Sequence, residues 1–372
     1  MEIRWVFWIS LSILIVSVLT SFLISSKLTQ ASPAEEVLED CKTLYDNGIG
    51  KINLVFFSDK ETTKKYADFL LETPPLKDNK DSFNVFYIDD YKLDCEIYKG
   101  VAVLCYNKEI IKKAASCPND FIFAITDNPS NIRSSTYRNV VSINKNLPLT
   151  VLTHEFGHVF SNFAEEYVEE GAKIPKGSQN CQQQCSDFEG TKNGCYEGCT
   201  SSTYKRSIEN GVMRTLSSND FGTFDENLIL QKIEKSITEK SSSITGSVIF
   251  SPNQCSEKSY SLIEATYKDG DINILGKTQQ QGCFPEIGAE QFSYQTQSKG
   301  KITKGNFNPE LIFTDIQLPG DEILSGESLD PEGVSFFLQV PLDSNTLTVS
   351  DENGQEFFSQ NIANTGAEPC IA

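Results

Sequence analysis

The sequence of 372 residues contains only two histidines, two methionines and two tryptophans, and it is also poor in positive charge. Lys and Arg number 32 against 51 Asp and Glu, which gives a net charge of −19. A surface this acidic repels phosphate backbones, so the composition excludes nucleic acid as an expected partner. The scarcity of histidine means that any imidazole-based site must use one particular pair of side chains. Hydrophobic residues still make up 39% of the chain, which excludes a wholly disordered protein.

The chain also lacks the Cys-x-x-Cys pairs that form most cysteine zinc sites, although it contains eleven cysteines. Cysteines in an exported chain form disulfides, and an odd number leaves one cysteine over. Four of them are spaced as two pairs four residues apart, Cys181 with Cys185 and Cys195 with Cys199. Because residues at this spacing share a helix face, two disulfides, Cys181–Cys199 and Cys185–Cys195, could staple a hairpin. The alternative is a second zinc site built from all four.

An uncharged and mostly apolar stretch lies near the N-terminus, from Trp5 to Ser26. A helix of this length, at about 1.5 Å per residue, can cross a hydrocarbon core of roughly 30 Å. We therefore expect residues 1–27 to be a transmembrane signal-anchor that contacts the membrane through residues 5–26, with a cleaved signal peptide as the alternative. The expected location is the cell membrane, with a single span and everything after Lys27 outside the cytoplasm, or secretion after signal cleavage.

From residue 51 onward, apolar strand segments alternate with helices. Strands are expected at 52–57, 83–88, 121–125 and 139–144, and Glu61–Leu71 has helical spacing. A further helix is expected after Asp225, ending in a polar linker at Lys240–Ser243.

Beyond that linker the chain changes character. The strand-like segments there are short and are separated by turns, which predicts a β-sandwich. They include Gly246–Phe250, Val334–Val340 and Thr346–Ser350. The expected organisation is a stem over 28–50, an α/β (α+β) domain over 51–240 and a β-sandwich domain over 241–372.

Both histidines of the chain lie in one motif, His154-Glu155-Phe156-Gly157-His158, on a helix that Pro148 is expected to open. Residues four apart lie on one helix face, so both imidazoles can bind the same ion. Zinc accepts neutral histidine nitrogen at about 2 Å, and Glu155 lies close enough to reach a water molecule on that ion. The motif therefore predicts one zinc ion held by His154 and His158, with Glu155 as general base.

A catalytic zinc site needs a third protein ligand, and without a third histidine a carboxylate must supply it. The nearest candidates are Glu165 and Glu166. On a straight helix Glu165 would lie about 10 Å along the axis from His158, so the chain must turn back after the motif. Glu165 is the first choice for the third ligand and Glu166 is the alternative.

The stretch around the motif resembles the IgA-peptidase family of zinc metallopeptidases. The pattern of that family is H-E-x-G-H, an apolar residue five positions after the second histidine, and then Asp-Glu-Tyr. This chain has Phe163 in place of the usual Leu, and Glu165-Glu166-Tyr167 with Glu in place of the usual Asp. Further on, Gly211–Arg214 followed by Phe221-Gly222 resembles the Met-Arg and Phe-Gly segments of the family.

The resemblance covers roughly residues 50–240 and implies a metzincin-like fold, in which Met213 forms an apolar floor beneath the metal. By the same similarity, the strand over 139–144 would pair with an extended substrate. Tyr167 and Tyr204 are candidates to stabilise the oxyanion.

The leading hypothesis is a zinc-dependent endopeptidase that hydrolyses peptide bonds in a protein or peptide substrate by metal-activated water, with Glu155 as general base. A zinc amidase acting on cell-wall peptides would share this chemistry. The alternative from another class is a membrane-anchored adhesion or binding protein with a structural or vestigial metal site, which the predicted β-sandwich favours. No pro-segment with a cysteine switch is evident, and Cys41 in the stem is the one candidate for such a switch.

Overall fold

The computed structural model describes residues 38–169, 171–172, 174–188, 194–243, 252–285, 292–317, 321–329, 331, 333–351 and 353–363. Over these residues the fold is mixed α/β, with one large sheet and several smaller ones. The apolar segment at residues 5–26 lies outside the described residues. Within the described part of the chain, no helix is long and apolar enough to cross a membrane.

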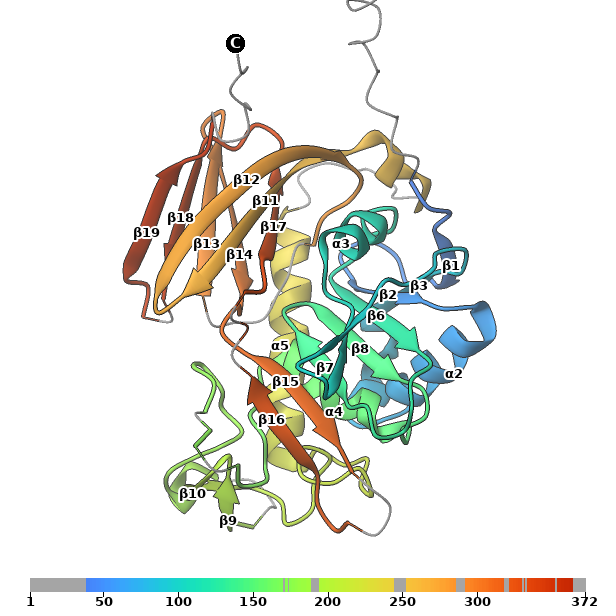
Figure 1. Ribbon diagram of the computed structural model, residues 1–372, viewed down its shortest axis with the longest axis vertical. Helices are drawn as coiled ribbons and strands as arrows, with labels where there is room; N and C mark the ends of the chain where they lie inside the picture. Colours follow the sequence, from blue (N-terminus) through green and yellow to red (C-terminus); the bar gives the residue numbers. More distant parts are fainter. Residues whose placement is uncertain are drawn as a thin grey trace, which may run out of the picture. The chain divides into compact units, whose positions relative to one another are not determined.

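The large sheet has the strand order β1-β3-β2-β6-β8-β7-β15-β16 (Figure 1). Its strands are β1 (Lys42–Tyr45), β2 (Ile52–Phe57), β3 (Phe83–Ile88), β6 (Phe121–Thr126), β7 (Ser134–Tyr137), β8 (Val140–Asn144), β15 (Ile312–Ile316) and β16 (Ser325–Leu329). The four strands β3, β2, β6 and β8 run parallel, and the others add antiparallel at the two ends. The central strands are mostly apolar because both of their faces are buried.

Helices cover both faces of this sheet. They are α2 (Lys60–Leu71), α3 (Lys108–Ala114), α4 (Thr150–Ser161) and α5 (Thr223–Ser243), with short 3₁₀ turns at η1 (Leu76–Ser82), η2 (Cys185–Phe188) and η3 (Pro252–Glu257). Side chains of α2, α4 and α5 share one core with alternate residues of the sheet, such as Phe56 and Phe123. The other alternate residues, such as Val55 and Ile122, pack with α3 on the opposite face. The period of two along each strand therefore divides the interior into two cores.

Two further sheets pack face to face about a third core, which is the arrangement of a β-sandwich. One has the order β12-β11-β17 and the other the order β14-β13-β18-β19 (Figure 1). Their strands are β11 (Ser259–Lys268), β12 (Asp271–Gln281), β13 (Phe292–Ser298), β14 (Lys301–Phe307), β17 (Phe336–Pro341), β18 (Thr346–Ser350) and β19 (Glu356–Asn361). Two small hairpins, β4 (Glu96–Tyr98) with β5 (Ala102–Leu104) and β9 (Tyr196–Cys199) with β10 (Ser201–Arg206), complete the described strands.

Several segments lie in elements other than those expected from the sequence. Strands β15 and β16 fall within the range assigned to the sandwich, yet they extend the large sheet beyond β7. Strand β1 falls within the expected stem and pairs with β3. The predicted linker Lys240–Ser243 is instead the last turn of α5, because the buried Lys240 ammonium pairs with Asp120 and donates to the Lys51 carbonyl at 2.9 Å. The predicted strand Gly246–Phe250 lies outside the described residues.

Five disulfides pair ten of the eleven cysteines. Cys181–Cys199 and Cys185–Cys195 are present, which confirms the predicted pairs and excludes the four-cysteine zinc site. The hairpin that they join contains β9 and β10, so the helix face that suggested this pairing is not what brings the cysteines together.

The other bonds are Cys41–Cys117, Cys95–Cys105 and Cys255–Cys283. Cys41 is therefore no metal switch, because its sulfur is bonded to Cys117. Cys370 lies outside the described residues.

Candidate metal centre

Helix α4 carries the histidine motif and is almost entirely buried. All residues from Val151 to Phe160 are buried, with the apolar side chains in the core beneath the sheet. The helix ends at Asn162, which adopts a left-handed conformation with φ of 54° and donates its N–H to the carbonyls of Gly157 and His158. Asparagine tolerates this conformation better than most residues, so the chain can reverse there without glycine. The predicted turn after the motif is therefore present, and it brings Glu165 back to the histidines.

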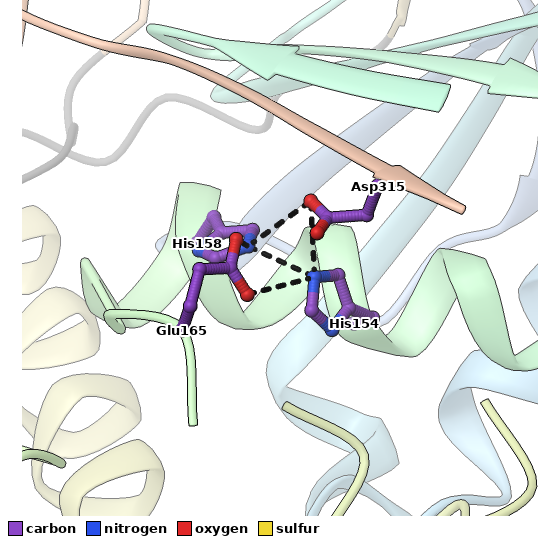
Figure 2. A group of neighbouring side chains, drawn as sticks. All are labelled: His154, His158, Glu165 and Asp315. Atoms are coloured by element: carbon purple, nitrogen blue, oxygen red, sulfur yellow. Dashed lines mark hydrogen bonds and ion pairs between the residues drawn. The ribbon is translucent and has the colours of Figure 1, made fainter. Parts of the chain in front are cut away.

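Two histidine and two carboxylate side chains converge on one point above α4 (Figure 2). The Nε2 atoms of His154 and His158 are 3.0 Å apart. Glu165 places its two carboxylate oxygens 2.9 Å from His158 Nε2 and 3.5 Å from His154 Nε2. Asp315, on β15, places Oδ2 3.2 Å from His154 Nε2 and 3.7 Å from His158 Nε2. At most 2% of any of these four residues is exposed, so the cluster is closed to solvent.

The hydrogen bonds behind the histidines determine which nitrogen faces the cluster. His154 Nδ1 lies 2.9 Å from the Val212 carbonyl, and His158 Nδ1 lies 2.7 Å from the Phe163 carbonyl. A carbonyl only accepts, so each Nδ1 carries the proton and each Nε2 presents a lone pair. When both histidines are neutral, the two Nε2 lone pairs and the carboxylate oxygens of Glu165 and Asp315 face one another, and none of these atoms carries a proton to donate. A cation bound among these atoms would satisfy this donor set.

The spacing of the donors fits a zinc-sized ion. Ligands about 2.0–2.1 Å from the metal at tetrahedral corners are about 3.3 Å from one another. The donor–donor distances in the cluster run from 2.9 to 3.7 Å and so bracket that value. Each histidine also has the backbone carbonyl partner that metal-binding histidines usually have. The residues present therefore fit one divalent ion.

The electrostatics of the cluster favour the same conclusion. Burial and then the charge of Asp315 raise the pKa of Glu165 well above its ordinary value. Burial lowers the pKa of His154, but the charges of Asp315 and Glu165 outweigh burial and raise that pKa overall. Both shifts favour the uptake of protons, so the cluster attracts positive charge. A divalent cation supplies that charge and displaces the protons.

Glu155 lies beside this cluster but is not one of its converging donors. The carboxylate is fully buried, and its Oε2 accepts a hydrogen bond of 2.6 Å from the hydroxyl of Thr136 on β7. Its Oε1 has no hydrogen-bond partner. Burial and then the charge of Asp315 raise the pKa of Glu155 well above its ordinary value. A buried carboxylate held at one oxygen and open at the other can accept a proton from a molecule at the cluster.

Met213 packs against the motif helix at Gly157. A Cβ added to Gly157 would come within 2.6 Å of the Met213 sulfur and 3.2 Å of the Phe221 ring. The preceding residue, Val212, supplies the carbonyl that orients His154. The segment therefore forms the floor of the site, and glycine at position 157 allows the close approach.

The two predicted tyrosines lie in different places. The hydroxyl of Tyr167 donates a hydrogen bond of 2.7 Å to Asp315 Oδ1, so this side chain reaches the cluster. Tyr204 packs against the Ala164 and Cys181 neighbourhood, and its hydroxyl accepts a hydrogen bond from Gln183. Of the two tyrosines, Tyr167 therefore contacts the cluster, whereas Tyr204 bonds to Gln183 in the disulfide-joined segment.

Glu166 points away from the cluster, although it is next to Glu165 in sequence. It pairs with Asp225 at the start of α5, and both carboxyl groups are fully buried. Burial raises the pKa of Glu166 to about 7, against the opposing effect of its hydrogen bond with Asp225. Glu165 is therefore the neighbour that faces the histidines.

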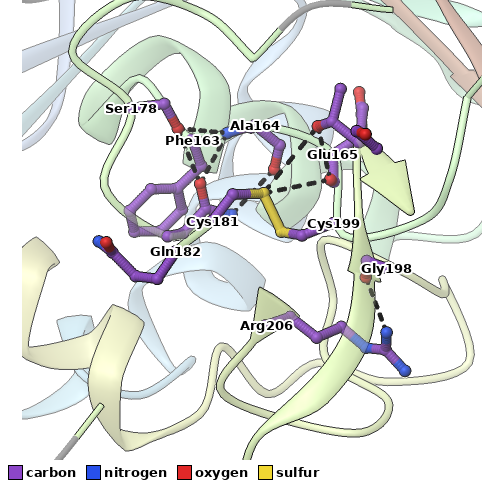
Figure 3. The surroundings of a disulfide bond; sticks show 12 residues. Phe163, Ala164, Glu165, Ser178, Cys181, Gln182, Gly198, Cys199 and Arg206 are labelled. Carbon is purple, nitrogen blue, oxygen red and sulfur yellow. Dashed lines mark hydrogen bonds between the residues drawn. A yellow bond between two sulfur atoms is a disulfide. The ribbon is translucent and has the colours of Figure 1, made fainter. Parts of the chain in front are cut away.

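The disulfide hairpin holds the segment that carries Glu165 (Figure 3). Thr200, next to Cys199, donates its hydroxyl to the Glu165 carbonyl at 2.8 Å and its N–H to the Tyr167 carbonyl at 2.9 Å. On the other side, the Ala164 N–H donates to the Asn180 side chain at 2.8 Å. The Cys181–Cys199 bond thus braces the chain between the motif and Tyr167.

Sequence reasoning missed Asp315 and Thr136. Asp315 lies 148 positions after Tyr167, in a strand that otherwise consists of apolar residues and one threonine. An acidic side chain inside a short apolar strand was the one available signal, because a buried carboxylate needs a partner. The expected substrate-pairing strand over 139–144 was wrong, because β8 is paired on both edges, by β6 and by β7.

No known protein-family model matches this chain, and no curated protein matches it.

Proposed function

We propose that the protein is a zinc-dependent endopeptidase that hydrolyses peptide bonds with Glu155 as general base. The observation that carries the proposal is the position of this carboxylate. It is buried beside a cluster that fits one divalent ion, it is not a converging donor, and Thr136 orients it. A metal site with a purely structural role would not need a second, separately positioned carboxylate.

The roles of the chain's own residues follow from this arrangement. His154, His158 and Glu165 would hold the ion, which when bound polarises the scissile carbonyl and makes a water molecule more acidic. Glu155 accepts the proton from the attacking water and passes it to the leaving amine. Thr136 keeps one carboxylate oxygen occupied, so that the other faces the reacting atoms. The Tyr167 hydroxyl now donates a hydrogen bond to Asp315. If that bond were broken, the hydroxyl could donate to the oxyanion instead.

The local architecture supports the metzincin-like interpretation. The methionine against Gly157 is the part that the resemblance to the IgA-peptidase family implied, and the reversal at Asn162 is the turn that a third ligand after the motif required. The proposed substrate class is a protein or peptide segment; in the structure β7 beside Glu155 is paired by β8 and by β15, so an extended segment could pair with it only if β15 moved away. We further propose export to the cell surface through residues 5–26, or secretion after signal cleavage, since five disulfides suit an oxidising compartment.

One observation favours the alternative, an anchored adhesion or binding protein whose metal is structural. Asp315 adds a fourth protein donor to the cluster, and structural zinc sites are usually closed by four protein ligands. The sandwich of β11–β14 and β17–β19 would then be the working surface. The two candidate functions differ in what they expect of Glu155, which a structural site does not use.

The test compares Glu155→Gln with wild type for zinc content and for hydrolysis of an unfolded, fluorescently labelled protein. Both are also prepared with Asp315→Asn, because Asp315 takes the remaining donor position. We expect about one zinc per chain in every form, and loss of hydrolysis by roughly 100-fold or more with Glu155→Gln. Glu234→Gln, an exposed glutamate of α5, is the matched control and should change neither quantity. Equal hydrolysis with and without Glu155 would refute the mechanism.

A further inference from the structure

The β15–β16 hairpin covers the metal cluster on the side where the sheet would otherwise end at β7. Strand β15 pairs antiparallel with β7, with Phe313 opposite Thr136. Alternate residues of a strand point to the same side, so Phe313 and Asp315 project together. The Phe313 ring stacks on His158 with centroids 4.1 Å apart, while Asp315 reaches the histidine nitrogens. One short strand thus takes both the free edge of β7 and one donor position.

The second strand of the hairpin is shaped for the same contact. Gly326 on β16 lies opposite Asp315. A Cβ at Gly326 would come within 2.2 Å of the Tyr167 hydroxyl, 2.3 Å of Asp315 Oδ1 and 2.4 Å of the Thr314 carbonyl oxygen. Tyr167 donates to that same Asp315 oxygen. The absence of a side chain at position 326 therefore leaves the space in which Tyr167 and Asp315 meet.

Only non-covalent contacts hold the hairpin in place. The Ser328 N–H donates to Glu169 at 3.0 Å, and the Leu324 N–H donates to the Arg214 carbonyl at 2.8 Å. Neither strand of the hairpin contains a cysteine, so none of the five disulfides ties it down directly. The bond to the Glu169 carboxylate is charge-assisted, and Ile312, Ile316 and Leu324 are buried, so detachment has a cost, but it breaks no covalent bond.

We propose that the β15–β16 hairpin is a built-in inhibitory segment, in which Asp315 is a removable fourth metal ligand that holds the place of the substrate. The proposal rests on the proposed peptidase function. In the closed arrangement all four donor positions are protein groups and the edge of β7 is already paired. When the hairpin detaches, His154, His158 and Glu165 remain and one position opens, which is what a catalytic zinc site requires. The freed edge of β7 then accepts an extended peptide as an added strand.

Two variants open the site by different means. Asp315→Asn keeps the size of the side chain and weakens the ligand, whereas Gly326→Ala changes no ligand residue and displaces the hairpin together with Asp315. Gly276→Ala is the matched control, because a Cβ at this glycine of β12 meets nothing within 4 Å. Each variant is checked for folding by circular dichroism and loaded with zinc to equal occupancy.

The first readout is the rate at which a chromogenic chelator in excess extracts zinc. We expect Asp315→Asn and Gly326→Ala to release zinc roughly tenfold faster than wild type or more, and Gly276→Ala to match wild type. The second readout is hydrolysis of a fluorogenic peptide library, which should rise in both opened variants.

Three results would each contradict either the inhibitory role of the hairpin or the peptidase function. Zinc release and hydrolysis at wild-type rates in both opened variants would overturn the inhibitory role. Hydrolysis by wild type as fast as by the opened variants would also overturn it, while leaving the peptidase function standing. Faster zinc release without hydrolysis in any form would support the closing role of the hairpin and refute the peptidase function.

Discussion

The contact between Gly157 and Met213 leads to a prediction whose sign is opposite to that of helix propensity. Replacing glycine by alanine inside a helix ordinarily stabilises a protein by about 1 kcal/mol. At Gly157, however, the new Cβ would come within 2.6 Å of the Met213 sulfur, and that side chain is 1% exposed and cannot move into solvent. Overpacking of a core costs about 1–3 kcal/mol. We therefore expect Gly157→Ala to lower the free energy of unfolding by about 0–2 kcal/mol.

A double-mutant cycle separates the two opposing effects. In a Met213→Ala background the sulfur is absent, so Gly157→Ala should show the ordinary helix gain of about 1 kcal/mol. The coupling energy between the two positions is then about 1–3 kcal/mol. Urea unfolding followed by circular dichroism, at the same saturating zinc concentration for all four proteins, measures each term. Zinc release provides a second readout, because Val212 beside Met213 orients His154, so Gly157→Ala should also release zinc faster.

One result would refute this reasoning. If Gly157→Ala stabilises wild type by as much as it stabilises the Met213→Ala protein, then Met213 does not press on the helix. Val212 would then be the only residue of the segment that supports the site, through its bond to His154.

Two further predictions concern buried charges away from the metal. Lys240→Met should lower the free energy of unfolding by about 3–5 kcal/mol, because it leaves the buried Asp120 carboxylate without its ammonium partner. Lys64→Met in an exposed ion pair is the control, with an expected loss below about 1 kcal/mol, and equal losses in urea unfolding would contradict the burial argument. Burial and then the neighbouring Glu166 raise the pKa of Asp225 well above its ordinary value, so the folded protein keeps a proton that the unfolded chain releases above about pH 4. This contribution to stability is complete at acidic pH and is lost as the pH rises. Asp225→Asn should therefore gain stability relative to wild type between pH 5 and pH 8, by at most about 1.4 kcal/mol for each pH unit, and a constant difference in unfolding free energy would show that this group does not titrate on unfolding.

Local patterns predicted the elements that they define by themselves. The apolar runs at 52–57 and 83–88 are strands with those same bounds. Apolar character over five or six residues bounded by turns is a property of the segment itself, so it can be recognised without knowing the fold. The same patterns could not show which sheet a strand joins. Strands β15 and β16 resemble sandwich strands in sequence, and only the free edge of β7 decides that they belong to the large sheet.

Within the site, too, local spacing was readable from the sequence and long-range contacts were not. The spacing of His154 and His158 places both rings on one helix face whatever surrounds the helix, and with no other histidine in the chain the pair was identifiable from sequence. The choice between Glu165 and Glu166 depended on the left-handed turn at Asn162, which sets the direction of the chain after the helix.

The tertiary structure alone brought Asp315 to the histidines, because the contact joins residues far apart in the chain through the pairing of β15 with β7. It likewise placed Thr136 against Glu155, through the packing of β7 on α4. Helix geometry repeats every few residues and so can be inferred from spacing, whereas the pairing of distant strands depends on every edge left open by the rest of the fold. Spacing alone therefore identified the histidine pair, and only the fold showed which carboxylates reach it.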